Sequence, residues 1–584
     1  MSDSTPASAP GSSAADLAAL RAAAAQAAAE AAEARAQAAA AALAAAEAAA
    51  AGAPPPPAAT PPPAAAPAVP VSEHAAQVVA GYTFSGPMLP LGALVEDDVP
   101  VPGAVVGVPL AMMNRHGLVA GATGTGKTKT LQVLAEGLSA AGVPVFVADI
   151  KGDLSGLAVP GTPNEKLLAR TASVGQDWVA TASPVQFLSL GGIGEGTPVR
   201  TTVTDFGPLL LGKVLGLNAT QESSLGLLMH WADTQGLALL DLKDLQATIA
   251  YLVSDEGKPQ LKGIGGLSAA TAGVILREIV GLQAQGADAF FGEPAFDVSE
   301  LLRTTTDGRG VISALELPAV QDRPALFSTF LMWLLAELFQ ELPEVGDPDK
   351  PRLVFFFDEA HLLFTGASAD FLTQVTQTVR LIRSKGVGVF FVTQSPKDVP
   401  SDVLGQLGNR VQHALRAFTP DDATALRAAA RTFPTSPYDL EQLLQSLGTG
   451  EAVVTVQSER GTPTPVAWTR LRAPQSSMEP MPAAELTAAV AASPLSARYA
   501  AAVDRESAYE LLAVRAEKAQ EAARRAEEAE EAADEAARKA KEARQQAAPR
   551  RSTSRTSPLD SLLRSAGTQL GREITRSIFG TRRR

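Results

Sequence analysis

The sequence predicts an α/β protein: a mostly parallel sheet flanked by helices, with a helical insertion and low-complexity helical flanks. Three observations support this fold class. Short apolar runs alternate with helical segments from residue 111 onward, which is the pattern of βαβ units. A glycine-rich motif at 121–128 joins the first of these runs to a helix. A later run, 353–357, is apolar throughout, as expected of a strand that is covered on both faces.

The N-terminal flank, residues 1–75, is dominated by alanine and proline. Residues 1–13 have a composition typical of disorder, and 14–52 have high helix propensity but few large apolar side chains. Residues 54–70 form an extended Pro/Ala linker, either a spacer to a partner or low-complexity sequence without a specific role. Residues 76–110 are expected to form a small N-terminal β segment, too short for a closed barrel.

The segment 121–128 fits the phosphate-binding pattern G-x-x-x-x-G-K-[ST] at every fixed position. It follows an expected strand at 117–120 and precedes an expected helix that contains 131–135. Glycines let main-chain N–H groups close around phosphate oxygens, and the helix N-terminus adds a favourable partial charge. Lys127 is expected to contact the β- and γ-phosphates of a nucleotide, and Thr128 to hold Mg²⁺. The predicted nucleotide-binding residues are Gly121, Ala122, Thr123, Gly124, Thr125, Gly126, Lys127, Thr128 and Lys129.

A second polar group follows the next expected strand, 143–148. Asp149, Lys151 and Asp153 stand around Gly152 at the C-terminal end of this strand, close to the phosphate-binding loop. Asp149 is a candidate for the second shell of the metal ion. Lys151 and Asp153 are equally compatible with a structural turn.

The alternation of strands and helices is interrupted between residues 216 and 303, where three segments carry helical spacing. This predicts a helical insertion that divides the α/β core into a first part, 111–215, and a second part, 304–475. The alternation resumes with a strand at 311–317 and a helix around 327–339. The three helical segments of the insertion are 217–236, 242–253 and 267–285.

Two later strands end in polar side chains. Strand 353–357 is followed by Asp358, placed to support Mg²⁺ through a water, and by Glu359, placed to orient and deprotonate an attacking water. Strand 387–393 is followed by Gln394, which either bonds the γ-phosphate or the attacking water, or caps the next turn. Because neighbouring parallel strands deliver their C-terminal ends to one crevice, these side chains are expected to meet.

Strands are also expected at 411–415 and 452–456, and residues 476–548 are expected to form a linker and a charged helix. Its region 505–548 lacks clear apolar heptads after Leu512, which favours a single solvated helix held by i,i+4 charge pairs.

The last segment, 549–584, predicts a basic amphipathic tail. From residue 550 onward, nine arginines against Asp560 and Glu573 give a net charge of 9 − 2 = +7. Such a helix binds DNA, an anionic membrane surface or a neighbouring subunit, or it packs on the α/β core with its basic face in solvent. The apolar face consists of Leu559, Leu562, Leu563, Ala566, Leu570, Ile574 and Ile578.

Composition narrows the function classes. The chain of 584 residues has no cysteine, which excludes disulfides and thiolate metal sites and is typical of a cytoplasmic protein. No transmembrane segment or secretory signal is expected, because charged residues interrupt 14–52 and the N-terminus lacks a basic cluster. The net charge of −13 weakens a DNA-binding hypothesis without removing it, because nucleic-acid affinity depends mainly on basic residues at the contact surface.

Four segments, 114–132, 149–156, 358–361 and 392–396, resemble the HerA-like ATPases, closest to a bacterial, largely uncharacterised helicase branch of that group. The resemblance covers roughly residues 76 to 475. The broader group contains the FtsK-like DNA translocases. The resemblance implies a RecA-like P-loop ATPase fold, a hexameric ring and ATP-driven movement on DNA.

The resemblance also implies that an arginine from the next subunit completes each ATP site. Arg383 matches best the arginine that such proteins place just before the sensor strand, and Arg380 lies three residues earlier on nearly the same helix face. Arg410 and Arg416 are weaker choices. Each of these side chains is otherwise a cation favoured at a helix C-terminus or a member of a surface salt bridge.

Together, the motifs and the resemblance predict Mg²⁺-dependent ATP hydrolysis by a ring motor that translocates on, or unwinds, double-stranded DNA, with a nuclease as a candidate partner. Two other functions fit the same motifs. One is a non-translocating ATP-dependent switch or scaffold whose flanks recruit partners. The other is a motor for protein remodelling or secretion.

Overall fold

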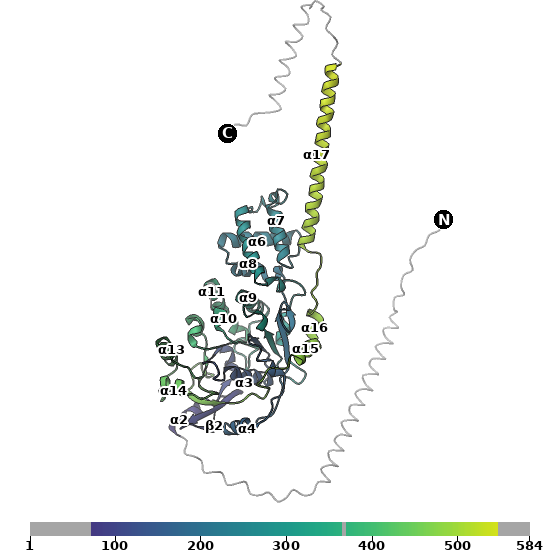
Figure 1. The fold of residues 1–584 in the computed structure, drawn as a ribbon. Coiled ribbons are helices and arrows are strands. Elements are labelled where there is room, and N and C mark those ends of the chain that lie inside the picture. The colour runs from purple at the N-terminus through teal and green to yellow at the C-terminus, as the bar shows by residue number, and fades with distance from the viewer. Residues whose placement is uncertain (1–71, 365–368, 547–584) are drawn as a thin grey trace, which may run out of the picture. The chain divides into compact units, whose positions relative to one another are not determined.

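The computed structural model describes residues 72–364 and 369–546 (Figure 1). The expectations for 1–71 and for the basic tail fall outside the described residues. Within the described part, one sheet contains twelve strands in the order β2-β1-β12-β11-β10-β3-β9-β8-β4-β7-β5-β6.

Eight neighbouring strands, from β10 to β6, are parallel and form the part of the sheet that the βαβ pattern predicts. Most are buried along their whole length, which explains why their sequences are apolar on both faces. The predicted fold class is therefore confirmed. The strands are β3 (Gly117–Ala120), β4 (Val145–Asp149), β5 (Val185–Leu190), β6 (Thr197–Val199), β7 (Ile312–Glu316), β8 (Leu353–Phe357), β9 (Val387–Thr393) and β10 (Asn409–Gln412).

Four antiparallel strands extend the sheet beyond β10. The N-terminal β segment is a hairpin whose strand β1 pairs with β12, so it forms an edge of the main sheet. Helix α2 (Glu73–Gly81) precedes it, and the Ser72 side chain caps this helix by accepting from the Ala75 N–H. The four strands are β1 (Met88–Glu96), β2 (Val99–Pro109), β11 (Glu451–Thr455) and β12 (Ala467–Leu471).

Each face of the sheet has its own core. Along β8, Phe355 and Phe357 enter one apolar cluster and Phe356 enters the other, because successive side chains of a strand point to opposite faces. Helix α3 (Lys127–Ala140) covers the Phe356 face, whereas α9 (Pro324–Glu341) and α11 (Ala369–Ile382) cover the other. The remaining short helices are α4 (Glu165–Ser173), α10 (His361–Phe364), α12 (Ser401–Leu404), α13 (Pro420–Ala430) and α14 (Leu440–Ser446).

Several helices lie between β6 and β7 along the chain, where the sequence predicts an insertion (Figure 1). Their buried side chains join the same apolar cluster as α9. Gly207 bends the first helix with a φ of +76°, directly before Pro208. The helices are α5 (Val203–Val214), α6 (Ala219–Thr234), α7 (Leu242–Val253) and α8 (Ala269–Ala284).

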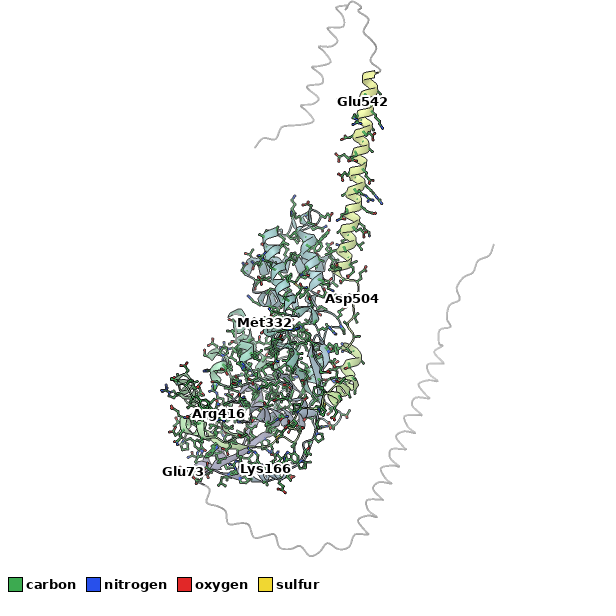
Figure 2. The ribbon with its side chains drawn as sticks, in the orientation of Figure 1. Glu73, Lys166, Met332, Arg416, Asp504 and Glu542 are labelled. Atoms are coloured by element: carbon green, nitrogen blue, oxygen red, sulfur yellow. The ribbon has the colours of Figure 1, made fainter. Side chains whose placement is uncertain are left out.

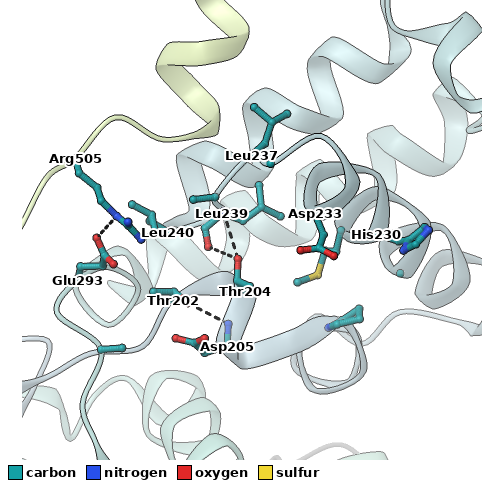
Figure 3. Close-up of a pocket in the computed structure, with 16 residues that line it drawn as sticks. Thr202, Thr204, Asp205, His230, Asp233, Leu237, Leu239, Leu240, Glu293 and Arg505 are labelled. Atoms are coloured by element: carbon teal, nitrogen blue, oxygen red, sulfur yellow. Dashed lines mark hydrogen bonds and ion pairs between the residues drawn. The ribbon is translucent and has the colours of Figure 1, made fainter.

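A cavity of about 690 Å³ lies between α5, α6 and the segment that precedes α7 (Figure 3). Leu237 and Leu239 form part of its apolar wall, and the Thr204 hydroxyl donates to the Leu239 carbonyl over 3.1 Å. An ion pair of 2.7 Å between Arg505 and Glu293 lines another side. The polar groups at this cavity already have protein partners or face solvent.

After β12, the chain forms α15 (Ala483–Ala492), α16 (Pro494–Tyr499) and the long helix α17 (Ala508–Gln546). The start of α17 is fixed to α7, because the Asp244 carboxylate accepts from the Ser507 hydroxyl and from the Tyr509 N–H. Residues 521–543 are exposed throughout (Figure 2). None of the helices in the described ranges combines the length and apolarity needed to cross a membrane.

Candidate active site

The loop between β3 and α3 has the backbone shape of an anion cradle. The Gly121 N–H donates to the Thr393 carbonyl over 3.2 Å, which fixes the start of the loop to β9. A side chain at Gly121 would place its Cβ 2.4 Å from the Cβ of His413, so only glycine fits. Gly126 has a φ of +110° and begins α3, so the free N–H groups of the first helical turn face the loop.

Lys127 is the buried cation of this loop, with 7% of its surface exposed. Its ammonium donates to the Ala122 carbonyl over 3.2 Å. Burial lowers the pKa of Lys127; Glu359 counteracts this effect and Lys151 adds to it. A desolvated ammonium bonded to the loop's own carbonyl fits a binding partner with strong negative charge, such as a phosphate.

The other residues predicted for nucleotide binding lie around Lys127. Thr123 and Gly124 are exposed at the loop tip, and Thr128 is half-buried in the first turn of α3. The Lys129 ammonium donates to the Met478 carbonyl, so this side chain ties down the segment that follows β12. A contact of Lys129 with nucleotide therefore depends on its main-chain N–H.

Asp358 and Glu359 follow β8 and are 2% and 5% exposed. One Asp358 oxygen accepts from the Glu359 N–H over 2.9 Å, while the buried Oδ2 has no hydrogen-bond partner among the described residues. Burial, followed by the charge of Glu359, raises the pKa of Asp358 to about 7. An orphaned, desolvated carboxylate oxygen fits a place beside a divalent cation.

No group of three potential His, Cys, Asp or Glu ligands occurs within the described ranges. Proteins hold Mg²⁺ with one or two carboxylates, while waters and substrate phosphates supply the other ligands. Thr128 and Asp358 are the residues that would hold it.

Protein groups surround the Glu359 carboxylate. Lys151 forms an ion pair with Oε1, while Gln394 Nε2 at 3.4 Å and His361 Nδ1 at 3.2 Å approach Oε2. Burial acts to raise the pKa of Glu359, but the bond and charge of Lys151 outweigh it, so the net pKa lies below its ordinary value. Glu359 also has a φ of +46°, a left-handed conformation that costs a non-glycine residue about 1–3 kcal/mol and is concentrated at functional sites.

The structure brings Gln394 to Glu359, whereas the turn after β9 is capped by Ser395 together with Asp398. Lys151 pairs with Glu359, which the sequence does not predict, because a Lys between two acids is equally compatible with a structural turn. Its position two residues after β4 was the available signal, since β4 pairs with β8.

Two further acids, Asp149 and Glu316, lie near this site. Asp149 accepts from the N–H groups of Lys151, Gly152 and Leu154, which fixes the turn and leaves its carboxylate engaged by the main chain. Glu316, at the end of β7, is 5% exposed, and its Oε1 has no partner among the described residues. Burial, then the charges of Asp149 and Asp153, raise the pKa of Glu316 to about 8.

The candidate arginines fall in three places. Arg383 and Arg380 are exposed. Arg383 precedes the N-terminal end of β9, whereas the phosphate loop follows the C-terminal end of the parallel neighbour β3. Arg410 donates to main-chain carbonyls, including that of Leu407, as a structural residue does. Arg416 is exposed and lines a cavity of about 510 Å³ beside Gln394 and the loop tip. Arg383 is thus separated from its own site by β9, whose seven residues span about 23 Å.

Comparison with solved structures gives distant similarities. The bacterial conjugative coupling protein TrwB, in an unbound monoclinic form, is 16% identical with a TM-score of 0.43, over 69% of this chain and 94% of that chain. TrwB in complex with the ATP analogue ADPNP is 16% identical with a TM-score of 0.44, over 68% and 99%. VirB4 of Thermoanaerobacter pseudethanolicus is 14% identical with a TM-score of 0.40, over 67% and 97%. No curated protein matches the sequence.

The model of a sequence family gives a broader match. It aligns with residues 97–584, from the N-terminal hairpin through the phosphate loop, the β8 carboxylates and the C-terminal region. The match covers most of the chain and includes each strand that contributes a side chain to the site. The protein therefore belongs to the family described as Helicase HerA-like C-terminal.

Proposed function

We propose that this protein is a Mg²⁺-dependent ATPase that assembles into a hexameric ring and drives translocation on, or unwinding of, double-stranded DNA. The observation that carries the ATPase assignment is the meeting of the Lys127 loop with Asp358 and Glu359 at one edge of the sheet. These groups bind phosphate, support a cation and accept a proton, which are the requirements of phosphoryl transfer to water.

In this proposal, each residue has a separate task. Lys127 and the N–H groups of the loop bind the phosphates, and Thr128 and Asp358 hold Mg²⁺, which neutralises charge on the phosphates. Glu359 takes a proton from the attacking water, and Gln394, within reach of Glu359, orients that water. The left-handed backbone of Glu359 supports its assignment as the base.

The ring assignment is supported by family membership and by the position of Arg383. An exposed arginine at the edge opposite its own phosphate loop is suited to act in a neighbouring subunit. There it would stabilise the charge that develops on the transferred phosphoryl group.

Double-stranded DNA is the proposed polymer, with the cytoplasm as the place of action and a nuclease as a candidate partner. The decisive experiment measures the ATPase rate with and without duplex DNA, on protein whose mass has been determined with ATP bound. Stimulation by duplex DNA of a six-subunit species supports the proposal. Stimulation by an unfolded polypeptide instead would support a protein motor, and a rate that neither polymer changes would support a switch.

The basic tail provides a second test of the DNA assignment. Deleting residues 550–584 removes a net charge of +7 and should make the dependence of log affinity on log salt shallower, because fewer counterions are released from DNA. An unchanged slope would assign the tail to another partner, for which anionic vesicles and subunit assembly are the next assays.

A further inference from the structure

We propose that Lys151 is a positioning residue that exchanges between Glu359 and the γ-phosphate of bound ATP, so that the catalytic carboxylate is released only when a γ-phosphate is present. The inference rests on the proposed ATPase function. It assigns a role to a lysine outside the phosphate-binding motif and explains how the site distinguishes ATP from ADP.

The contacts of Glu359 provide the first step of the argument. Lys151 occupies Oε1, and Oε2 is approached by Gln394 and His361. A carboxylate that accepts a proton from water needs an oxygen turned toward that water. Both oxygens are directed to protein groups, so Lys151 would have to leave Oε1 before that oxygen could accept a proton from water.

The two members of the ion pair differ in their freedom to move. The Glu359 side chain is 6% exposed, whereas the Lys151 side chain is 46% exposed. The backbone at Lys151 is held by Asp149, which accepts from the N–H groups of residues 151, 152 and 154. The main chain at Lys151 is therefore fixed while its side chain is flexible. The ammonium can move at little cost to the stability of the fold.

The charges around Lys127 identify where the Lys151 ammonium would go. The charges of Lys151, Glu359 and Asp358 all influence the pKa of Lys127. Both lysines and both carboxylates therefore belong to one electrostatic cluster at the phosphate loop. A γ-phosphate brought next to Lys127 adds more negative charge than one carboxylate supplies. It would therefore compete with Glu359 for Lys151, whereas ADP would not.

The test compares nucleotide affinities without hydrolysis. The ratio Kd(ADP)/Kd(ADPNP), measured by calorimetry with Mg²⁺, reports binding of the γ-phosphate. Lys151→Met should lower this ratio about tenfold, and Lys151→Arg should retain it, since the charge remains. Lys397→Met is the matched control, because Lys397 is an exposed lysine on the cavity beside Gln394 that does not pair with Glu359. If both Met variants lowered the ratio equally, Lys151 would contribute only general electrostatic attraction, and the proposal would be overturned.

A double-mutant cycle separates exchange from a static ion pair. Glu359→Gln frees Lys151, so the ratio should rise severalfold, and this gain should be smaller when Lys151 is already Met. If Lys151 only neutralises Glu359, the gain from Glu359→Gln would instead be larger in the Lys151→Met background, because the carboxylate there repels the phosphate unscreened. That sign overturns the inference and leaves the ATPase assignment intact. Wild-type protein that binds neither nucleotide would overturn the proposed function itself.

Discussion

Charged side chains are buried at the C-terminal ends of the parallel strands and exposed along the outer part of α17. At the strand edge, Lys127, Asp358 and Glu359 are at least nine-tenths buried and share one electrostatic cluster. Along α17, four i,i+4 ion pairs join side chains that are each more than half exposed. Water solvates the second group, whereas burial and neighbouring charges shift the pKa values of the first group in ways that a reaction can use.

Substitutions at the strand edge should have the largest effects. Lys127→Ala removes the buried cation of the phosphate loop and should abolish hydrolysis and most nucleotide affinity. Glu359→Gln should retain nucleotide binding but lose turnover by about 10²–10⁴-fold, because an amide keeps the shape and takes no proton. Steady-state ATPase rates and calorimetric affinities check both expectations. Near-wild-type turnover in Glu359→Gln would show that another group activates the water.

Arg383 extends the comparison to a charge that is exposed in one chain yet expected to be buried against a neighbour. Arg383→Ala should bind ATP but hydrolyse it more slowly by on the order of a thousandfold. Mixing it with Glu359→Gln should restore some activity, since each variant can complement the other at a shared interface. Mixed assemblies that form but remain inactive would transfer the role to Arg380, which is exposed on α11.

The buried acid Glu316 at the end of β7 should link stability to pH. Its folded pKa of about 8 lies above the value of an exposed Glu, so the folded state binds the proton more tightly. The resulting stabilisation is complete below pH 4.5 and is lost as the pH rises through 8. At pH 9, Glu316→Gln should be more stable than wild type by on the order of 5 kcal/mol, whereas at pH 5 the difference should be under about 1 kcal/mol.

Denaturation midpoints between pH 5 and 9 measure this difference. Glu528→Gln on α17 is the control for the same chemical change at an exposed position, since the Glu528 side chain is 67% exposed. Parallel profiles for wild type and Glu316→Gln would mean that Glu316 is already ionised in the folded protein.

The same comparison explains what the sequence could predict. The apolar runs at β3, β4, β7, β8 and β9 identified the parallel sheet, because a strand buried on both faces needs an uninterrupted apolar sequence. The phosphate loop was readable because its glycines are required by local geometry. The short edge strand β6 and the pairing of the N-terminal hairpin with β12 were not predicted, since long-range pairing leaves little local signal.

Contacts across the sheet were harder to anticipate at the site as well. Asp358 and Glu359 stood out because two acids follow an apolar strand. The partnership of Lys151 with Glu359 depends on the neighbouring positions of β4 and β8, which lie about two hundred residues apart in the chain. Glu316 likewise becomes unusual only when β7 places it beside Asp149.

The smallest effect is expected on α17, where the Arg524–Glu528 pair tests whether exposure alone makes a charge pair weak. A double-mutant cycle with Arg524→Ala and Glu528→Ala should give a coupling of about 0.3–0.5 kcal/mol, which disappears in 1 M salt. Ellipticity at 222 nm during thermal denaturation is the measurement. Solvated side chains gain little from pairing because water already stabilises both charges. A coupling above about 1 kcal/mol that persists in salt would mean that the pair is desolvated, and hence that a partner or another subunit packs on this part of α17.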